Sequence, residues 1–318
     1  MQNTYHEHIE KYFVTYEVGQ HNYVTPYLKK TKTATTKLPV GMHRDGLMIL
    51  GCQKSYRRRM TQHYAKTLID SGRKVLFITD NLNPEAYRAE YECDVFCRHI
   101  GLDSFEEEEV HFEEITGKFN SEILDNGAKL HVVTANEINK RMDEEAQLGF
   151  DDKLLNLLEE VVKDRFNKWR LAKNPHKDKE KLVVIIDEDW SPNVLDPERF
   201  GRIARNLKFR DVGFVICGFA SPRYQGVVNN MEHFVFFRLK DAISDLEPFR
   251  HILRRTCIEW SKSKIGHKYH TRLDERDVKT LEPKEFYYFQ GSLAGFSNRS
   301  TFDAGGCKCC LAEPIPYY

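Results

Sequence analysis

Residues 181–189 read KLVVIIDED, and this stretch decides the fold that the rest of the chain can adopt. Five consecutive apolar residues, 182–186, run directly into Asp187 and Glu188. A continuous β-branched run of this kind predicts a strand buried on both faces of a parallel sheet. Carboxylates at the C-terminal end of such a strand lie where open α/β sheets place their ligands. A buried strand that ends in an acidic turn is the alternative interpretation.

The segments on either side of this strand follow the pattern of a parallel sheet. Upstream, GLMILG (46–51) predicts a short strand, followed by a helix over 52–70 and a glycine cap at Gly72. KVLFITDN (74–81) predicts a second strand, and 84–100 a second helix. Strand, glycine turn, helix and strand in this order are typical of βαβ units. We therefore expect an α/β fold, a mostly parallel sheet with helices on both faces.

Further strands are predicted at 128–135, 212–219, 233–241 and 285–291, and further helices at 151–170, 196–211 and 247–264. In the helix at 151–170 the apolar side chains share one face. They are Leu154, Leu155, Leu158, Val161, Val162, Phe166 and Trp169.

The ends of the chain and one internal segment look different from this core. Residues 1–45 predict a small β-rich extension with strands at 12–18 and 22–28, then a basic, Thr-rich connector at 29–37. Residues 101–127 are acidic and predict an exposed excursion. We expect three parts: an N-terminal extension (1–45), an α/β domain (46–295) and a Cys-containing tail (296–318).

The amino-acid composition limits the classes of protein to which this chain can belong. The 318 residues carry 48 Lys and Arg against 48 Asp and Glu, so no uniform basic coat for nucleic acid is present. No apolar run approaches the ~20 residues of a membrane span, and the N-terminus does not resemble a signal peptide. The sequence predicts a soluble intracellular protein.

The eight cysteines are scattered and predict reduced thiols rather than a disulfide framework. Cys307, Cys309 and Cys310 could bind a soft metal with Cys93, Cys97 or His99. Because no second CxxC pair exists, we favour a reduced tail over a metal site.

If residues 182–186 end in a metal-binding carboxylate, the turn after residue 50 is the candidate phosphate loop. Such a loop reads G-x-x-x-x-G-K-[ST], because backbone N–H groups, a Lys and a hydroxyl must converge on phosphate and metal. This chain reads GCQKSYRR from Gly51 to Arg58.

Two registers are open for this loop. In the first, which we favour, Tyr56, Arg57 and Arg58 stand in the Gly, Lys and Ser/Thr places, and the helix begins at Arg57. In the second, the loop is three residues shorter, and Lys54 and Ser55 serve as the Lys-Ser pair. Either register departs from the motif. In the first, Tyr56 carries a Cβ where the backbone should approach phosphate, and Arg58 cannot replace a hydroxyl as a metal ligand. The second keeps the right chemistry but offers too few residues to wrap a phosphate.

The order of these elements resembles a known family. From about residue 46 to residue 291 the chain resembles the RecA-like P-loop ATPases, and within them the FtsK/HerA group of DNA translocases and viral genome-packaging ATPases. The segments that carry the resemblance are GLMILG with its helix, KVLFITD (74–80), VVIIDED (183–189), 203–223 and 227–241. DnaB-like hexameric helicases share the same order and remain an alternative.

The resemblance implies roles for individual residues. It makes Asp187 the Walker B metal carboxylate, Glu188 the catalytic base, and Ser221 the hydroxyl near the sensor strand, which ends Gly218-Phe219-Ala220 where Gln or Asn is expected. Arg238 is implied as a charge supplied to the nucleotide of a neighbouring subunit, with Arg202 and Arg205 as competitors. The implied nucleotide-binding residues are Gly51, Lys54, Ser55, Arg57, Arg58, Asp187 and Ser221.

The same resemblance implies ATP and Mg²⁺ as cofactors, double-stranded DNA as a partner, and a homo-oligomeric ring or an active ATPase partner. Association with a virion is a further implied location. Two functions stay open at this point: an ATP-driven DNA translocase, favoured by Asp187 and Glu188, and a pseudo-ATPase that binds nucleotide or DNA without turnover, favoured by the degenerate loop. An α/β protein without a nucleotide is the third hypothesis.

Overall fold

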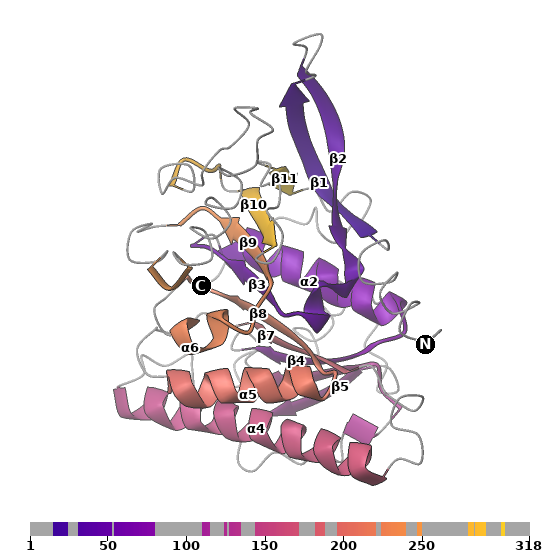
Figure 1. Ribbon diagram of the computed structural model, residues 1–318, viewed down its shortest axis with the longest axis vertical. Helices are drawn as coiled ribbons and strands as arrows, with labels where there is room; N and C mark the ends of the chain where they lie inside the picture. The colour runs from indigo at the N-terminus through magenta and orange to yellow at the C-terminus, as the bar shows by residue number, and fades with distance from the viewer. Residues whose placement is uncertain are drawn as a thin grey trace, which may run out of the picture.

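One eleven-stranded sheet organises the chain (Figure 1). The computed structural model describes residues 15–24, 31–52, 54–79, 110–114, 124–125, 127–134, 144–171, 182–187, 196–220, 224–239, 247–249, 279–282, 284–290 and 300–302. The strand order is β2-β1-β11-β10-β9-β3-β8-β7-β4-β6-β5. The strands are β1 (Thr15–Val24), β2 (Thr31–Pro39), β3 (Leu47–Leu50), β4 (Lys74–Thr79), β5 (Val110–Glu114), β6 (Leu130–Thr134), β7 (Leu182–Asp187), β8 (Gly213–Gly218), β9 (His233–Phe237), β10 (Glu285–Gln290) and β11 (Ser300–Phe302).

The sheet divides into a parallel and an antiparallel part. From β9 to β5 every neighbouring pair is parallel. From β2 to β9 the neighbours are antiparallel. The strands β3, β4, β7 and β8 are buried along their lengths except for Lys74, as expected of strands covered on both faces. The predicted α/β class and its mostly parallel sheet are confirmed.

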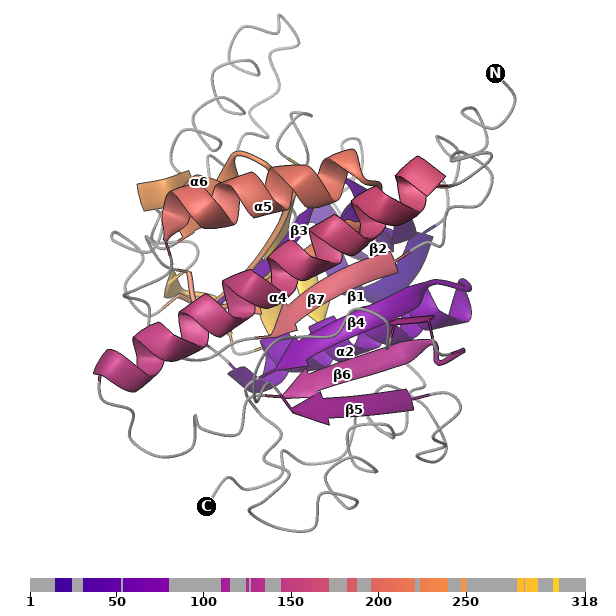
Figure 2. The same ribbon diagram turned by 90° about the horizontal axis from the view of Figure 1, so that it is seen from below.

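Helices cover the two faces of the parallel part. The helix α2 (Lys54–Asp70) packs on one face, and α4 (Glu144–Leu171), α5 (Pro197–Phe209) and the short α6 (Gln225–Val228) pack on the other (Figure 2). Five apolar side chains of α2 that recur at helical spacing are buried: Met60, Tyr64, Ala65, Leu68 and Ile69. Short 3₁₀ turns form at Val40–Arg44 and Glu247–Phe249.

Three segments differ from the sequence prediction. The Thr-rich segment predicted as a connector forms β2, because β-branched residues fit a strand and β1 pairs along it. The acidic segment predicted as an excursion contains β5, which adds an edge strand next to β6. A short strand, β11, lies in the predicted tail and pairs with β1 and β10. The three-part domain division stays a prediction.

The helix α4 is longer than predicted, and its apolar face is buried over only part of its length. Leu154, Leu155, Leu158 and Val161 are buried and Val162 is partly buried, but Phe166 and Trp169 are 38% and 48% exposed. The last turns of α4 therefore do not pack into the core. The helices predicted at 84–100 and over most of 247–264 lie outside the described residues.

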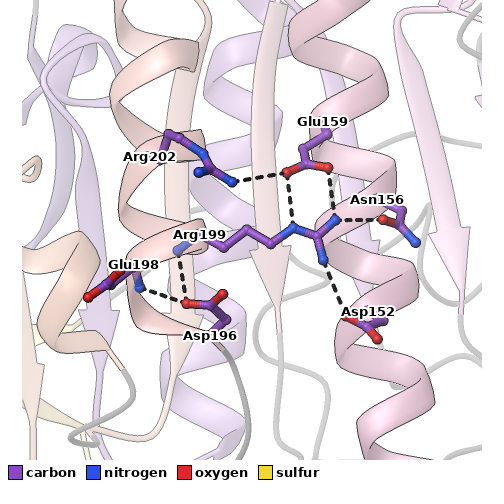
Figure 3. Close-up of polar contacts among 7 residues, drawn as sticks. All are labelled: Asp152, Asn156, Glu159, Asp196, Glu198, Arg199 and Arg202. Carbon is purple, nitrogen blue, oxygen red and sulfur yellow. Dashed lines mark hydrogen bonds and ion pairs between the residues drawn. The ribbon is translucent and has the colours of Figure 1, made fainter.

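Polar contacts fix α5 against α4 (Figure 3). The carboxylate of Asp196 caps α5 by accepting hydrogen bonds from the backbone N–H groups of Glu198 and Arg199, both at 3.0 Å. The guanidinium of Arg199 donates two hydrogen bonds to Glu159 of α4, at 3.0 and 2.8 Å. It also donates to Asn156 at 2.6 Å and to Asp152 at 3.2 Å. A forked guanidinium that meets several acceptors is worth more than an isolated surface pair.

Removal of this contact by Arg199→Met should lower the free energy of unfolding by about 1 kcal/mol, the upper end for exposed pairs. Urea denaturation followed by circular dichroism measures it. Arg202→Met is the matched control on the same helix, because Arg202 lies 3.8 Å from Glu159 and is exposed. Equal losses of unfolding free energy in Arg199→Met and Arg202→Met would contradict a stronger contact at Arg199.

The same contact predicts a pH dependence of stability. The hydrogen bond from Arg199 lowers the pKa of Glu159 below its ordinary value. Because the folded-state pKa is lowered, the stabilisation is fully present above the ordinary pKa of Glu, about 4.3, and is lost as the pH falls through the lowered value. The difference in stability between wild type and Glu159→Gln should therefore shrink as the pH is lowered from 6 towards about 3. A constant difference over that range would contradict the lowered pKa.

Candidate functional site

The candidate site lies at the C-terminal ends of the parallel strands. The turn after β3 begins at Gly51, and Asp187 is the last residue of β7. β8 lies between these two strands, and its Cys217 pairs in register with Asp187. The helix after β3 packs on one face of the sheet and the helix after β7 on the other. This is the topological switch point at which open α/β sheets bind ligands.

The connection from β3 to α2 is short. β3 ends at Leu50 and α2 begins at Lys54, so the helix start at Arg57 that the favoured register requires is wrong. Tyr56, Arg57 and Arg58 lie inside the first turns of α2. In length the turn agrees with the second register, which makes Lys54 and Ser55 the first residues of the helix. The side chains of these two residues lie outside the described part of the chain.

The backbone N–H groups at the start of this turn are used by neighbouring strands. Gly51 donates to the carbonyl oxygen of Gly218 at 3.2 Å, and Cys52 donates to the carbonyl oxygen of Arg238 at 2.8 Å. A Cβ at position 51 would lie 2.7 Å from the Cβ of Phe237, so only glycine fits against β9. Gly51 is therefore required by strand packing, and neither N–H group points to an anion.

Arg57 is fully buried and stabilises the turn rather than facing solvent. Its guanidinium donates a hydrogen bond to the carbonyl oxygen of Gly51. It also lies over the ring of Phe219, 4.8 Å from the ring centroid. The hydroxyl of Thr61, itself fully buried, donates to the backbone carbonyl of Arg57 at 3.0 Å. The sequence analysis missed Phe219 and Thr61 as partners of Arg57, and no sequence signal singles them out.

Arg58 and Asp187 form a buried ion pair. The Nε of Arg58 donates to Oδ2 of Asp187 at 2.8 Å, and the two side chains are 8% and 1% exposed. Oδ1 of Asp187 is buried and has no hydrogen-bond partner among the described residues. Asp187, predicted as the metal carboxylate, and Arg58, predicted as a nucleotide-binding residue, are thus brought together as an ion pair.

The third arginine, Arg59, lies on a different side of α2. It is partly exposed, and its guanidinium lies 6.0 Å from the ring centroid of Tyr56. The dense basic cluster of the sequence is therefore split: Arg57 contacts the turn, Arg58 contacts Asp187, and Arg59 is near the surface.

The pKa of Cys217 depends on the charged side chains at the C-terminal ends of β7 and β8. Burial first, and then the negative charge of Asp187, raise the pKa of its thiol far above the usual value, while Arg57 and Arg58 act in the opposite direction. The thiol therefore stays protonated. Among the described residues, two guanidinium groups and one carboxylate act on this thiol, whereas the acidic Glu188 and Asp189 that follow Asp187 lie outside the described part of the chain.

The described residues do not fit a Mg²⁺ ion at Asp187. Mg²⁺ requires oxygen ligands in a near-octahedral arrangement. Arg58 donates to Oδ2 of Asp187, and a guanidinium offers no acceptor. Among the described residues, no group of three or more His, Cys, Asp or Glu could hold a metal ion.

The structure describes some of the remaining predicted site residues and leaves others undescribed. Glu188, Ser221 and the cysteines of the tail lie outside the described residues. Arg238 is exposed and follows β9 directly, with its carbonyl bonded to the turn at Cys52. Its competitors Arg202 and Arg205 are exposed on α5, and Arg202 pairs with Glu159 of the same chain. In the described ranges no helix has both the length and the apolar character to cross a membrane.

Comparison with known proteins returned structures but no family. No family model and no curated protein matches the sequence. The DNA-packaging ATPase B204 from Sulfolobus turreted icosahedral virus aligns with 14% identity and a TM-score of 0.42, covering 82% of this chain and 98% of that chain. The genome packaging NTPase B204 from Sulfolobus turreted icosahedral virus 2, in complex with AMPPCP, aligns with 13% identity and a TM-score of 0.44, covering 82% and 99%.

The conjugation coupling protein TcpA of pCW3, with ATPγS, aligns with 12% identity and a TM-score of 0.44, covering 91% of this chain and 65% of that chain.

Because Arg58 and Asp187 are buried as a pair, we expect the removal of one charge to lower the free energy of unfolding much more than the removal of both. Arg58→Met should lower the free energy of unfolding by about 3–5 kcal/mol, because it leaves the buried carboxylate of Asp187 without its partner. The double substitution Arg58→Met with Asp187→Leu should lower the free energy of unfolding much less than Arg58→Met alone, because it removes both charges. Chemical denaturation measures both variants.

Arg59→Met is the matched control, since Arg59 is the adjacent residue on α2, is partly exposed and lies 6.0 Å from the ring centroid of Tyr56. It should cost about 1 kcal/mol or less. Equal losses at positions 58 and 59 would contradict a buried pair.

Proposed function

We propose that this chain is a nucleotide-binding subunit of a DNA-translocating or genome-packaging assembly, and that it binds the nucleotide without hydrolysing it alone. The single observation that carries the proposal is the ion pair between Arg58 and Asp187. The guanidinium already compensates the charge of this carboxylate, which disfavours a metal ion at the same group.

The position of the nucleotide follows from the strand order. The order β9-β3-β8-β7-β4 places the turn at Gly51 and the end of β7 at one edge of the sheet, with α2 starting beside them. The first turn of α2 contains no acidic residue. The positive end of a helix dipole, together with the guanidinium groups of Arg57 and Arg58, favours an anion such as a polyphosphate. Lys54 and Ser55 are the proposed phosphate-binding residues of this turn.

The DNA in this proposal comes from the sequence resemblance to the FtsK/HerA group. Members of that group act as rings, so we propose a homo-oligomer or a complex with an active ATPase. In such an assembly Arg238 is the proposed contact to a neighbouring subunit, because it is exposed and follows the strand that borders the turn.

An ATP-driven motor is the second candidate. It is favoured by the consecutive carboxylates Asp187 and Glu188 at the end of a buried strand. In this candidate Glu188 is the catalytic base, and Arg58 must leave Asp187 before Mg²⁺ can bind.

Steady-state hydrolysis separates the two candidates. With ATP and Mg²⁺, with and without double-stranded DNA, the wild-type chain should show no hydrolysis above background, and Glu188→Gln should change nothing. A fluorescent ATP analogue should still bind, because binding needs the anion site alone.

Glu198→Gln is the control, an acid-to-amide change at an exposed residue on α5. Hydrolysis that DNA stimulates, that Glu188→Gln abolishes and that Glu198→Gln leaves intact would replace our proposal with the motor. Absence of any nucleotide binding would overturn both candidates.

A further inference from the structure

We propose that the guanidinium of Arg58 occupies the place of a divalent cation beside Asp187, so that this site excludes metal and takes a polyphosphate anion without it. The polyphosphate part rests on the function proposed above, whereas the exclusion of metal rests on the ion pair alone.

The first argument is geometric. The Nε of Arg58 lies 2.8 Å from Oδ2 of Asp187, and both side chains are almost completely buried. Asp187 is the last residue of a strand that pairs on both sides, with Thr79 of β4 and Cys217 of β8. The backbone of Asp187 is therefore held on both sides, and its carboxylate is buried beside Arg58.

The second argument is electrostatic. A cation bound to either oxygen of Asp187 would lie within a few ångströms of a buried guanidinium, and like charges at that distance repel strongly in a site removed from water. Arg57 adds a second positive charge, since it acts on the same Cys217 thiol as Arg58 and Asp187 do. Among the described residues, the charges beside Asp187 thus oppose a further cation at its carboxylate.

The third argument concerns what the two arginines would do for an anion. A guanidinium carries five N–H donors in a planar fork and stays charged at any pH that the protein meets. The Nε of Arg58 donates to Asp187, and this contact holds the guanidinium at the end of β7. Neutralisation of phosphate oxygens is the task that Mg²⁺ performs in most nucleotide sites, and a fixed guanidinium can perform it without metal.

Metal binding is the direct test, and it needs no nucleotide. Mn²⁺ binding is followed by electron paramagnetic resonance, in wild type, Asp187→Asn, Arg58→Thr and Arg59→Thr. Wild type and Asp187→Asn should bind Mn²⁺ equally poorly. Arg58→Thr supplies a hydroxyl and frees the carboxylate, so its Mn²⁺ affinity should rise at least about tenfold and fall again when Asp187→Asn is added. Arg59→Thr, the adjacent substitution, should gain nothing.

Two outcomes of this test overturn the exclusion of metal. One is a Mn²⁺ site in wild type that Asp187→Asn removes. The other is an Arg58→Thr variant, folded by circular dichroism, that gains no affinity. The wild-type measurement decides the matter even if Arg58→Thr fails to fold.

A nucleotide titration tests the polyphosphate part separately. Wild type should bind ATPγS with the same affinity, within about twofold, in Mg²⁺ and in a chelator, whereas in Arg58→Thr the affinity should depend on Mg²⁺. Binding by wild type that requires Mg²⁺ would overturn the inference. Failure to bind ATPγS in either condition would overturn the proposed function and the polyphosphate part together, while the Mn²⁺ result would still decide whether metal is excluded.

Discussion

A carboxylate with almost no access to water needs a partner, and this requirement governs the edge of the sheet where the candidate site lies. Asp187 ends a strand buried along its whole length, so its charge is removed from solvent by the same packing that forms the core. Arg58 of α2 supplies the partner. Because α2 begins only three residues after β3, the pair also fixes where the helix starts relative to the central strands. The turn, the helix and the strand end are thus one connected unit.

The same unit explains why three neighbouring arginines have three different roles. Successive residues of a helix point in different directions, about 100° apart. Arg58 points to Asp187, Arg57 reaches the carbonyl of Gly51 and the ring of Phe219, and Arg59 stays near the surface. A sequence shows such a cluster as one basic patch, but the periodicity of the helix divides it.

Much of the fold could be predicted because its core depends on patterns that are local in sequence. The run at 182–186 and the strands at 47–50, 74–79 and 213–218 are continuous apolar segments bounded by glycine or charge, and each forms a buried parallel strand. The strands at the antiparallel end of the sheet were harder to predict. β2 is rich in Thr and Lys and reads as a linker, since its partner β1 is what makes it a strand. The exposed end of α4 was missed because periodicity shows which residues share a face but not what covers it.

The position of the candidate site could be predicted from the sequence, but the side-chain contacts within it could not. That Asp187 and the turn after residue 50 would share an edge follows from the βαβ pattern and is observed. That Arg58 would face Asp187 could not be seen, because the two residues are 129 positions apart and the choice of loop register decides which side chain meets the carboxylate. A helix that begins at Lys54 puts Arg58 one turn into α2, at the level of the strand end.

The burial of Asp187 has a consequence for how related sequences should be interpreted. An aspartate at the end of a central strand is usually counted as a sign of preserved chemistry when homologues are compared. Here the residue also holds the start of a helix in place, so selection for folding alone would keep it through any number of generations without catalysis. Persistence of this aspartate in a lineage is therefore no measure of activity, and the residue that stands opposite it on α2 is the more informative position.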